Sequence, residues 1–85
     1  MKEFQYVIQD QLGIHARPAG MLVKKAAEFQ SSITLECGAK KADARRIMAV
    51  MGMGVKQGQE LTVRVEGADE EAAAAQMEAF LKENL

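Results

Sequence analysis

The sequence predicts an α+β domain in which three helices cover one face of a four-stranded antiparallel sheet, an open-faced β-sandwich. Two observations support this prediction. Several short segments alternate apolar with polar residues, as in strands with one buried face, and others carry apolar residues at helical spacing. In chain order these segments give βαββαβα. Strands with a single apolar face bury it under helices and leave the other face in water.

The first strand and the first helix are predicted within residues 1–29. Alternation with polar neighbours predicts the strand, whose buried face consists of Phe4, Tyr6 and Ile8. Helical spacing of the apolar residues predicts a helix from Arg17 to about Phe29. His15 lies near the N-cap of this helix, and Ala16, Arg17 and Pro18 form its first turn, where a proline is tolerated.

A hairpin and a short helix are predicted within residues 32–54. Alternation at Ile33, Leu35 and Cys37 predicts a strand and a buried, apolar role for the single cysteine. The tripeptide Gly38-Ala39-Lys40 is typical of a turn, here into a short strand around Lys41–Ala44. From Ile47 to Met53 only a short helix fits, because Gly52 and Gly54 stop it.

One more strand and one more helix complete the order. The strand alternates at Leu61, Val63 and Val65. Asp69 is predicted to cap the last helix, whose buried stripe consists of Ala73, Met77, Phe80 and Leu81. Since no linker or repeat divides these elements, residues 1–85 are predicted to form a single domain.

Composition argues against several classes of protein. With 48% hydrophobic residues, 27% charged residues and one proline, the chain is expected to fold. One cysteine cannot form an internal disulfide, no cationic and apolar leader opens the chain, and no apolar stretch approaches the roughly 20 residues of a membrane helix. We therefore expect a soluble, cytoplasmic protein without membrane insertion. Nucleic acid is not an expected partner, because the four aromatic residues are not interleaved with basic ones.

Charge is unevenly distributed along the chain. Residues 1–56 hold nine Lys or Arg and five Asp or Glu, a net charge of +4, whereas residues 57–85 hold two and seven, a net charge of −5. The positive part contains the only histidine, His15. This asymmetry indicates steering toward an acidic partner or a phosphorylated group.

His15 combines a nucleophile with surroundings that attract an anion. A helix start carries a partial positive charge and up to four N–H groups without intrahelical partners, which suits a dianionic phosphoryl group. Imidazole titrates close to neutral pH, so its neutral, nucleophilic form is available there. With Arg17 as a nearby cation, this pattern favours a histidine that accepts and returns a phosphoryl group. The alternative is a histidine that caps its helix beside a solvated Arg17.

The chain lacks the motifs with which a protein draws phosphate from ATP. It has no Gly-x-x-x-x-Gly-Lys-Ser/Thr loop and no Cys/His cluster, so no cofactor and no metal site are expected. The glycines at 52 and 54 follow a helix instead of opening one. His15 is therefore expected to receive its phosphoryl group from one larger protein and to hand it to another, as a carrier and not as a complete enzyme.

Two motifs resemble the HPr family, the small phosphocarriers of the bacterial phosphoenolpyruvate-dependent sugar phosphotransferase system. Residues 13–19, Gly-Ile-His-Ala-Arg-Pro-Ala, resemble the phosphohistidine signature, and residues 46–54 resemble the second helix and the loop after it. The resemblance covers essentially all 85 residues. It implies phosphorylation at Nδ1 of His15, with the phosphate held by Ala16 and Arg17 at the helix start. It also implies enzyme I as the donor and IIA domains of sugar transporters as the acceptors.

The resemblance places the start of the first helix beside the second helix, so that a docking surface surrounds His15. Its apolar patch is expected to comprise Gly20, Met21, Ile47, Met48 and Met51. Within it, Ile47 is expected to be largely core, like Val50, and Met48 and Met51 to be exposed. Methionine suits a surface that accepts several partners, because its thioether repacks easily. A basic rim is expected from Arg17, Lys24, Arg45 and Arg46. A monomer is expected of a carrier that docks to its partners in turn.

Two residues depart from the family pattern. Arg46 stands where many HPr proteins carry a serine that a kinase phosphorylates, so this regulatory input is expected to be absent. A cation at a helix start is mildly unfavourable, so either Arg46 serves docking or Asp43 caps the helix and offsets the cost. Leu12 stands where relatives often have Ser, Thr or Asn, and the loss of that polar group is expected to loosen the site.

Other functions remain open at this point. One is a phosphocarrier of a nitrogen or regulatory branch without a role in sugar transport. Another is a regulatory docking module of HPr fold that transfers no phosphate, although such a module needs neither His15 nor Arg17. An enzyme in its own right is not expected, because no second acid, base or metal group accompanies His15.

Overall fold

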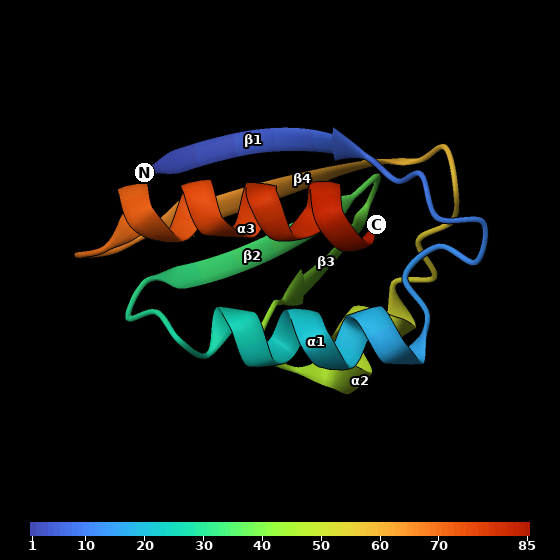
Figure 1. The fold of residues 1–85 in the computed structure, drawn as a ribbon, viewed down its shortest axis with the longest axis horizontal. Coiled ribbons are helices and arrows are strands. Elements are labelled where there is room, and N and C mark those ends of the chain that lie inside the picture. Colours follow the sequence, from blue (N-terminus) through green and yellow to red (C-terminus); the bar gives the residue numbers. More distant parts are fainter.

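Four strands and three helices form two layers (Figure 1). The computed structural model describes residues 1–85. In chain order the elements are β1 (Lys2–Val7), α1 (Ala16–Ala26), β2 (Ser32–Cys37), β3 (Lys40–Asp43), α2 (Ile47–Gly52), β4 (Glu60–Glu66) and α3 (Glu70–Asn84). This is the predicted order βαββαβα, and the predicted α+β sandwich with an antiparallel sheet is confirmed.

The strands lie in the order β1-β4-β2-β3, and all neighbours are antiparallel. β4 therefore lies in the middle of the sheet and pairs with the first strand of the chain on one side and with β2 on the other. Val63 of β4 is opposite Phe4 of β1 and also opposite Leu35 of β2. Because the partners in this row are all apolar, the buried face of the sheet is continuous across these three strands.

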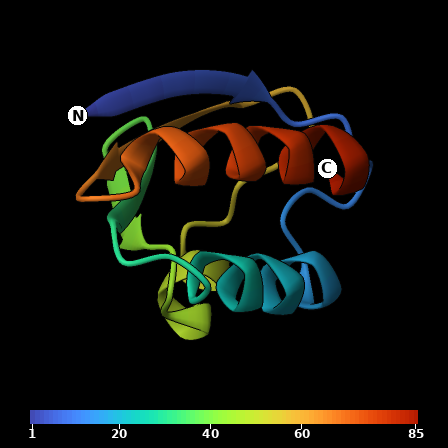
Figure 2. The same cartoon turned by 60° about the vertical axis from the view of Figure 1, so that its left-hand side comes forward.

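The apolar face of the sheet and the apolar stripes of the helices form one core. Figure 2 shows all three helices on the same side of the sheet. The inward residues of β2, β4 and α3 are buried, as is Ile8 just after β1: Ile8, Ile33, Leu35, Leu61, Val63, Val65, Ala73, Met77, Phe80 and Leu81. Of the predicted buried face of the first strand, Phe4 and Tyr6 are only partly buried against this core. Helix α1 contributes Ala19, Leu22 and Ala26, and α2 contributes Val50. The predicted buried stripe of α3 is thus confirmed.

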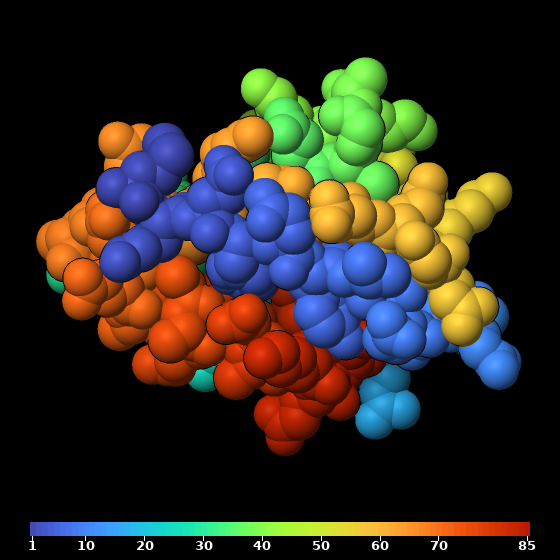
Figure 3. All heavy atoms as spheres, turned by 90° about the horizontal axis from the view of Figure 1, so that it is seen from above, coloured from blue at the N-terminus to red at the C-terminus, as the bar shows by residue number.

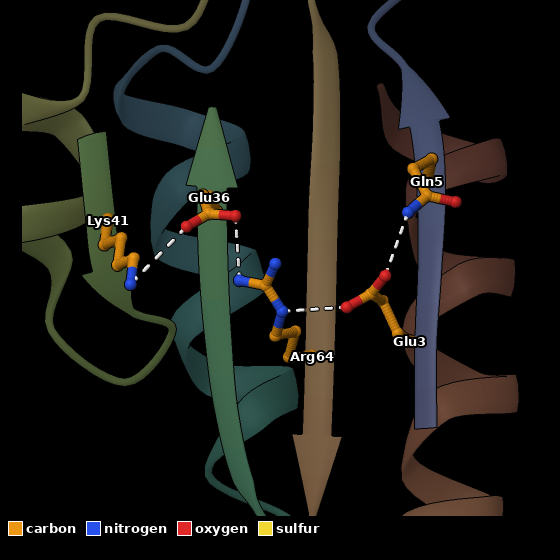
Figure 4. Close-up of polar contacts among 5 residues, drawn as sticks. All are labelled: Glu3, Gln5, Glu36, Lys41 and Arg64. Carbon is orange, nitrogen blue, oxygen red and sulfur yellow. Dashed lines mark hydrogen bonds and ion pairs between the residues drawn. The ribbon is translucent and has the colours of Figure 1, made fainter. Parts of the chain in front are cut away.

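The other face of the sheet carries a polar network that crosses all four strands (Figure 4). Arg64 of β4 lies 2.8 Å from Glu3 of β1 and 2.8 Å from Glu36 of β2, and Lys41 of β3 lies 3.6 Å from Glu36. The hydrogen bond from Arg64 holds the pKa of Glu36 below its ordinary value. Exposed ion pairs add little stability in water, so the main effect of the network is to keep this face solvated.

Helix α1 is shorter than predicted. It ends at Ala26, whereas the apolar spacing extended to Phe29. The N–H groups of Glu28 and Phe29 donate to carbonyls three residues earlier in the chain. This spacing is typical of tight turns, whereas an α-helix has a spacing of four residues. Phe29 still packs against the core, so the apolar spacing identified a buried residue but not the end of the helix.

The other boundaries differ by a residue or two. β3 spans Lys40–Asp43 instead of beginning at Lys41. α2 includes Gly52, and the positive φ that turns the chain away falls at Gly54, at +62°. A residue with positive φ just beyond a helix is a common way to end it, and glycine takes this conformation without strain. Gly54 therefore follows the end of α2, and Gly52 does not stop it.

Asp69 occupies the N-cap position of α3, as predicted, but its carboxylate does not cap the helix. The carboxylate accepts hydrogen bonds from the hydroxyl of Ser31 and from the N–H groups of Gln30 and Ser31, both at 2.9 Å. These bonds, first of all the one from the Ser31 hydroxyl, hold the pKa of Asp69 below its ordinary value. The side chain thus fastens the loop between α1 and β2 to the start of α3.

Stability is expected to depend on pH through Asp69. A carboxyl whose pKa is lower in the folded state stabilises that state above its unfolded pKa of about 3.9, and the stabilisation is lost as the pH falls through the folded pKa. We expect Asp69→Asn to lower the urea midpoint at pH 7, and the difference from the unaltered protein to shrink below about pH 4. Glu78→Gln, which removes the same charge from an exposed pair with Lys82, is the control. A difference that stays constant with pH would contradict this role.

Candidate functional site

The loop between β1 and α1 is held against residue 55 by a glycine. Gly13 has a φ of +67°, and a Cβ on it would lie 2.2 Å from the carbonyl oxygen of Val55. The next residue, Ile14, donates its N–H to the same oxygen at 3.0 Å. Since any side chain at position 13 would collide with backbone, only glycine allows this approach. The approach fixes the two residues that precede His15.

His15 is the N-cap residue of α1, as predicted. Its backbone is extended, with φ −95° and ψ −175°, and its carbonyl accepts the N–H of Ala19 at 3.0 Å. Its side chain makes no hydrogen bond to the helix, so the alternative of a histidine that caps its helix is wrong. The imidazole is 35% exposed and is therefore within reach of another protein.

The first turn of α1 offers unpaired hydrogen-bond donors. The bonds of this helix start with the N–H of Ala19, so the N–H groups of Ala16 and Arg17 have no intrahelical partner. Pro18, which is buried, has no N–H to satisfy. No acidic residue lies in this turn, and both Ala16 and Arg17 are exposed. The partial positive charge of the helix start therefore faces water next to His15.

A polar pocket adjoins His15 on the side of α3. It has a volume of about 290 Å³ and is lined by Asp10, His15, Arg17, Pro18, Met21, Glu83 and Asn84. α1 and α3 run in opposite directions, so the start of one and the end of the other lie at the same end of the molecule (Figure 1). Oδ1 of Asp10 lies 3.8 Å from Nε2 of His15. Sequence reasoning missed Asp10, Glu83 and Asn84, because only the fold brings the last two beside residue 15.

Asp10 is held in place from two sides. Its backbone N–H donates to the backbone oxygen of Leu85 at 2.9 Å, and its Oδ1 accepts the N–H of Leu12 at 2.8 Å. In Figure 3 the blue segment after β1 lies beside the red end of the chain. The side chain of Leu12 itself is 73% exposed. Asp10 thus supplies a side-chain hydrogen bond to the loop that contains Leu12.

α2 lies beside α1, as expected: a Cβ on Gly20 would be 3.8 Å from Cδ1 of Ile47. Met48 is 78% exposed and Met51 38%, and Met21 of α1 is also exposed. Val50 is fully buried, as predicted. The expectation that Ile47 is largely core is wrong, because it is 40% exposed. The small size of Gly20 brings the two helices close but leaves part of the Ile47 side chain in water.

Three of the four residues of the predicted basic rim are exposed cations: Arg17, Lys24 and Arg46. Arg45 is partly buried and is not part of the rim. Nη2 of Arg45 donates to the carbonyls of Phe29 and, at 2.7 Å, Ser31. Both carbonyls lie in the loop that follows the C-terminal end of α1, whereas His15 precedes the other end of this helix. Arg45 therefore fastens this loop to the segment before α2, and we leave it out of the docking surface.

Asp43 does not cap α2. Its Oδ1 accepts the N–H of Arg45 at 2.9 Å, and its carbonyl accepts the N–H of Arg46 at 3.0 Å, which forms a turn before the helix. Arg46 is the N-cap residue and makes no side-chain cap. Of the two alternatives for Arg46, helix capping by Asp43 is therefore wrong, and an exposed cation remains at the start of α2.

The rest of the molecule offers no second chemical centre. The sequence predicts a buried Cys37; the residue is only partly buried, although it packs against the core, and its thiol is free. No group of three or more His, Cys, Asp or Glu side chains is placed to hold a metal ion. None of the helices has the length and apolar content that crossing a membrane requires.

A half-exposed histidine, a cation and unpaired N–H groups at one helix start provide a nucleophile beside a binding place for an anion, which is the chemistry that a phosphocarrier needs. The family model for the PTS HPr component phosphorylation site matches residues 2–83. The chain therefore belongs to the HPr family, the phosphocarrier proteins of the phosphotransferase system.

Relatives match over nearly the whole chain. The phosphocarrier protein HPr of Lysinibacillus sphaericus is 45% identical over 83 residues, which are 98% of this chain and 94% of the relative. The solved structure of the histidine-containing phosphocarrier protein of Mycoplasma has a TM-score of 0.94 and 35% identity, covering 96% of this chain and 93% of its own. Crh of Bacillus subtilis, a catabolite repression protein solved as a domain-swapped dimer, has a TM-score of 0.78 and 33% identity, covering 100% and 98%.

The approach of Gly13 to Val55 is expected to matter for stability. Gly13→Ala would need a positive φ and would force its Cβ into backbone, so we expect it to lower the free energy of unfolding by about 1–3 kcal/mol. Gly52→Ala is the matched control, since nothing lies within 4 Å of its added Cβ and its φ is not positive. The control is expected to be neutral or slightly stabilising. Chemical denaturation measures both, and equal stability of Gly13→Ala and the unaltered protein would contradict the constraint.

Proposed function

We propose that His15 is the residue of this phosphocarrier that becomes phosphorylated, at Nδ1. The observation that carries the proposal is the position of His15: it is half exposed, and the next two residues, Ala16 and Arg17, have N–H groups without intrahelical partners. A phosphoryl group on the ring would accept hydrogen bonds from these groups and from the Arg17 guanidinium. Hydrogen bonds to a charged group are among the stronger ones in proteins.

Transfer needs only a nucleophile and groups that stabilise the moving charge. The lone pair of a neutral imidazole nitrogen attacks the phosphorus of the donor, the N–P bond forms, and the bond to the donor breaks with its electron pair. Arg17 and the first-turn N–H groups stabilise the negative charge on the phosphoryl oxygens. Because the site is open, these groups stay in contact with water and hold the phosphoryl group without burying it. This suits a group that must leave again.

The partners follow from the family: enzyme I would donate the phosphoryl group and IIA domains of sugar transporters would accept it. Both would bind one docking surface, which we define as Arg17, Gly20, Met21, Lys24, Arg46, Ile47, Met48 and Met51. Its apolar centre is exposed on α1 and α2, and its three cations would speed association with acidic partners. The carrier would act as a monomer in the cytoplasm. The likeness to Crh makes regulatory docking without phosphate transfer the second candidate.

Loss of His15 is expected to abolish phosphorylation. The unaltered protein is incubated with phosphoenolpyruvate, magnesium and an enzyme I that phosphorylates another HPr, and the product is read by intact mass and ³¹P NMR. We expect one acid-labile phosphoryl group, and none on His15→Ala, with the fold retained by circular dichroism. Gln11→Ala, an exposed substitution in the same loop, is the control and should be labelled normally. Labelling of His15→Ala would refute the site, and no labelling by the host's own enzyme I would favour regulatory docking.

Charge at the start of α2 is expected to assist docking. Arg46→Glu should weaken binding to enzyme I about fivefold at low salt, and the effect should fade at high salt, where the Debye length falls from about 10 Å at 0.1 M to about 3 Å at 1 M. Lys2→Glu, the same charge reversal at the start of β1, is the control and should bind normally. Titration calorimetry at several salt concentrations measures both. Binding of Arg46→Glu that equals that of the control at low salt would count against the docking surface as defined.

A further inference from the structure

The contact between Asp10 and His15 bears on which ring nitrogen reacts. We infer that Asp10 is a positioning residue whose carboxylate keeps a proton on Nε2 of His15 and leaves the lone pair on Nδ1. The inference rests on the proposed phosphorylation of His15. A carboxylate at Nε2 would give a physical reason for Nδ1 to be the nucleophile.

The geometry of Asp10 supports this role. Its Oδ1 lies 3.8 Å from Nε2 of His15, and no other carboxylate lies within 4.0 Å of an imidazole nitrogen. The same Oδ1 accepts the N–H of Leu12 at 2.8 Å, so the oxygen that faces the ring cannot swing away without breaking that bond. A separation of 3.8 Å is a charge contact and not a hydrogen bond. Contacts of catalytic groups are often long in a free protein and tighten in the complex.

The tautomer of a neutral imidazole follows from what its nitrogens face. One nitrogen carries the proton and the other the lone pair, and the neighbour of one nitrogen sets the state of both. An ionised carboxylate only accepts hydrogen bonds, so Asp10 favours the tautomer with the proton on Nε2. The lone pair is then on Nδ1, the nitrogen closer to the main chain of His15 and hence to the start of α1. A carboxylate that orients a histidine in this way is a known device of catalytic triads.

Other charged groups line the same pocket. Arg17 of α1 brings a positive charge to the pocket, and Glu83 of α3 brings a second carboxylate. Asn84 is neutral. Among these groups Asp10 alone has a fixed contact with a ring nitrogen. The effect of the pocket on the tautomer is therefore expected to come mainly from Asp10.

The transfer balances without any movement of a proton on the carrier. Nδ1 attacks phosphorus with its lone pair, the bond from phosphorus to the donor breaks and leaves its electron pair on the donor, and Nε2 keeps its proton. The ring is then a phosphorylated imidazolium, whose positive charge Asp10 stabilises. When the group moves on, the N–P electron pair returns to Nδ1, and the neutral Nε2–H tautomer is restored. A protonated ring is the better leaving group, so the same contact assists both halves of the cycle.

NMR of the imidazole tests this role with a matched pair of variants. Asp10→Asn keeps an oxygen for the N–H of Leu12 but removes the charge. Asp43→Asn makes the same change in an equivalent turn, where Oδ1 of Asp43 accepts the N–H of Arg45 at 2.9 Å. Two-bond ¹H–¹⁵N correlation spectra give the tautomer of the neutral ring. In Asp10→Asn we expect a smaller Nε2–H fraction, and in Asp43→Asn no change.

The rate of phosphorylation by phospho-enzyme I is measured on the same samples and is expected to fall for Asp10→Asn only. A tautomer unchanged in Asp10→Asn would overturn the inference, and so would equal changes in both variants. Because the NMR measurement needs no enzyme I, its outcome is separate from the test of phosphorylation. Failure to phosphorylate the unaltered protein would contradict the proposed function, whereas an unchanged ring would contradict the role of Asp10.

Discussion

The close approach of Gly13 to Val55 holds the loop directly before α1, and the positions of His15 and of the first turn of α1 depend on it. The pairing of β1 with β4 makes this approach possible: beyond the last paired residues, the N–H of Ile8 still bonds to Gln59, and the N–H of Gly58 to Ile8. The loop after β1 and the loop before β4 therefore leave the sheet side by side. At their contact the first loop reverses toward the helical layer, and His15 follows two residues later.

The one-sided sheet explains why the site lies at an edge of the helical layer. The face with the Arg64 network is solvated, so α1, α2 and α3 all pack on the opposite face. α1 contacts both other helices, and its start has the end of α3 on one side and α2 on the other. A helix start at this edge keeps its N–H groups in water while the body of the helix is buried. This combination makes the helix start both rigid and accessible.

The features that depend on local sequence pattern, namely the strands and the helix start at His15, could be predicted from the sequence. Alternation identified three strands, a turn signal identified the short β3, and the motif around His15 identified the residue and its place at the start of a helix. Features that depend on tertiary packing could not be predicted. The strand order and the position of Glu83 in the pocket beside His15 join segments far apart in the chain. The contact of Asp10 with His15 lies within one loop, but it depends on how that loop folds. Arg45 has the residue type expected of a basic rim, but its side chain binds a backbone carbonyl instead. Asp69 has the residue type expected of a helix cap, but its carboxylate binds N–H and hydroxyl groups of the loop between α1 and β2 instead.

His15 lies between two surfaces of opposite character, and this arrangement suits a carrier. Toward α2 lie exposed methionines with cations around them, a surface that a partner can cover. Toward α3 lies the polar pocket with Asp10 and Glu83. A partner that docks on the α2 side brings its own phosphoryl donor or acceptor to the open side of the ring and need not displace Asp10 from Nε2. Since donor and acceptor would use the same approach, one tautomer of His15 held by Asp10 would serve both the uptake and the release of the phosphoryl group.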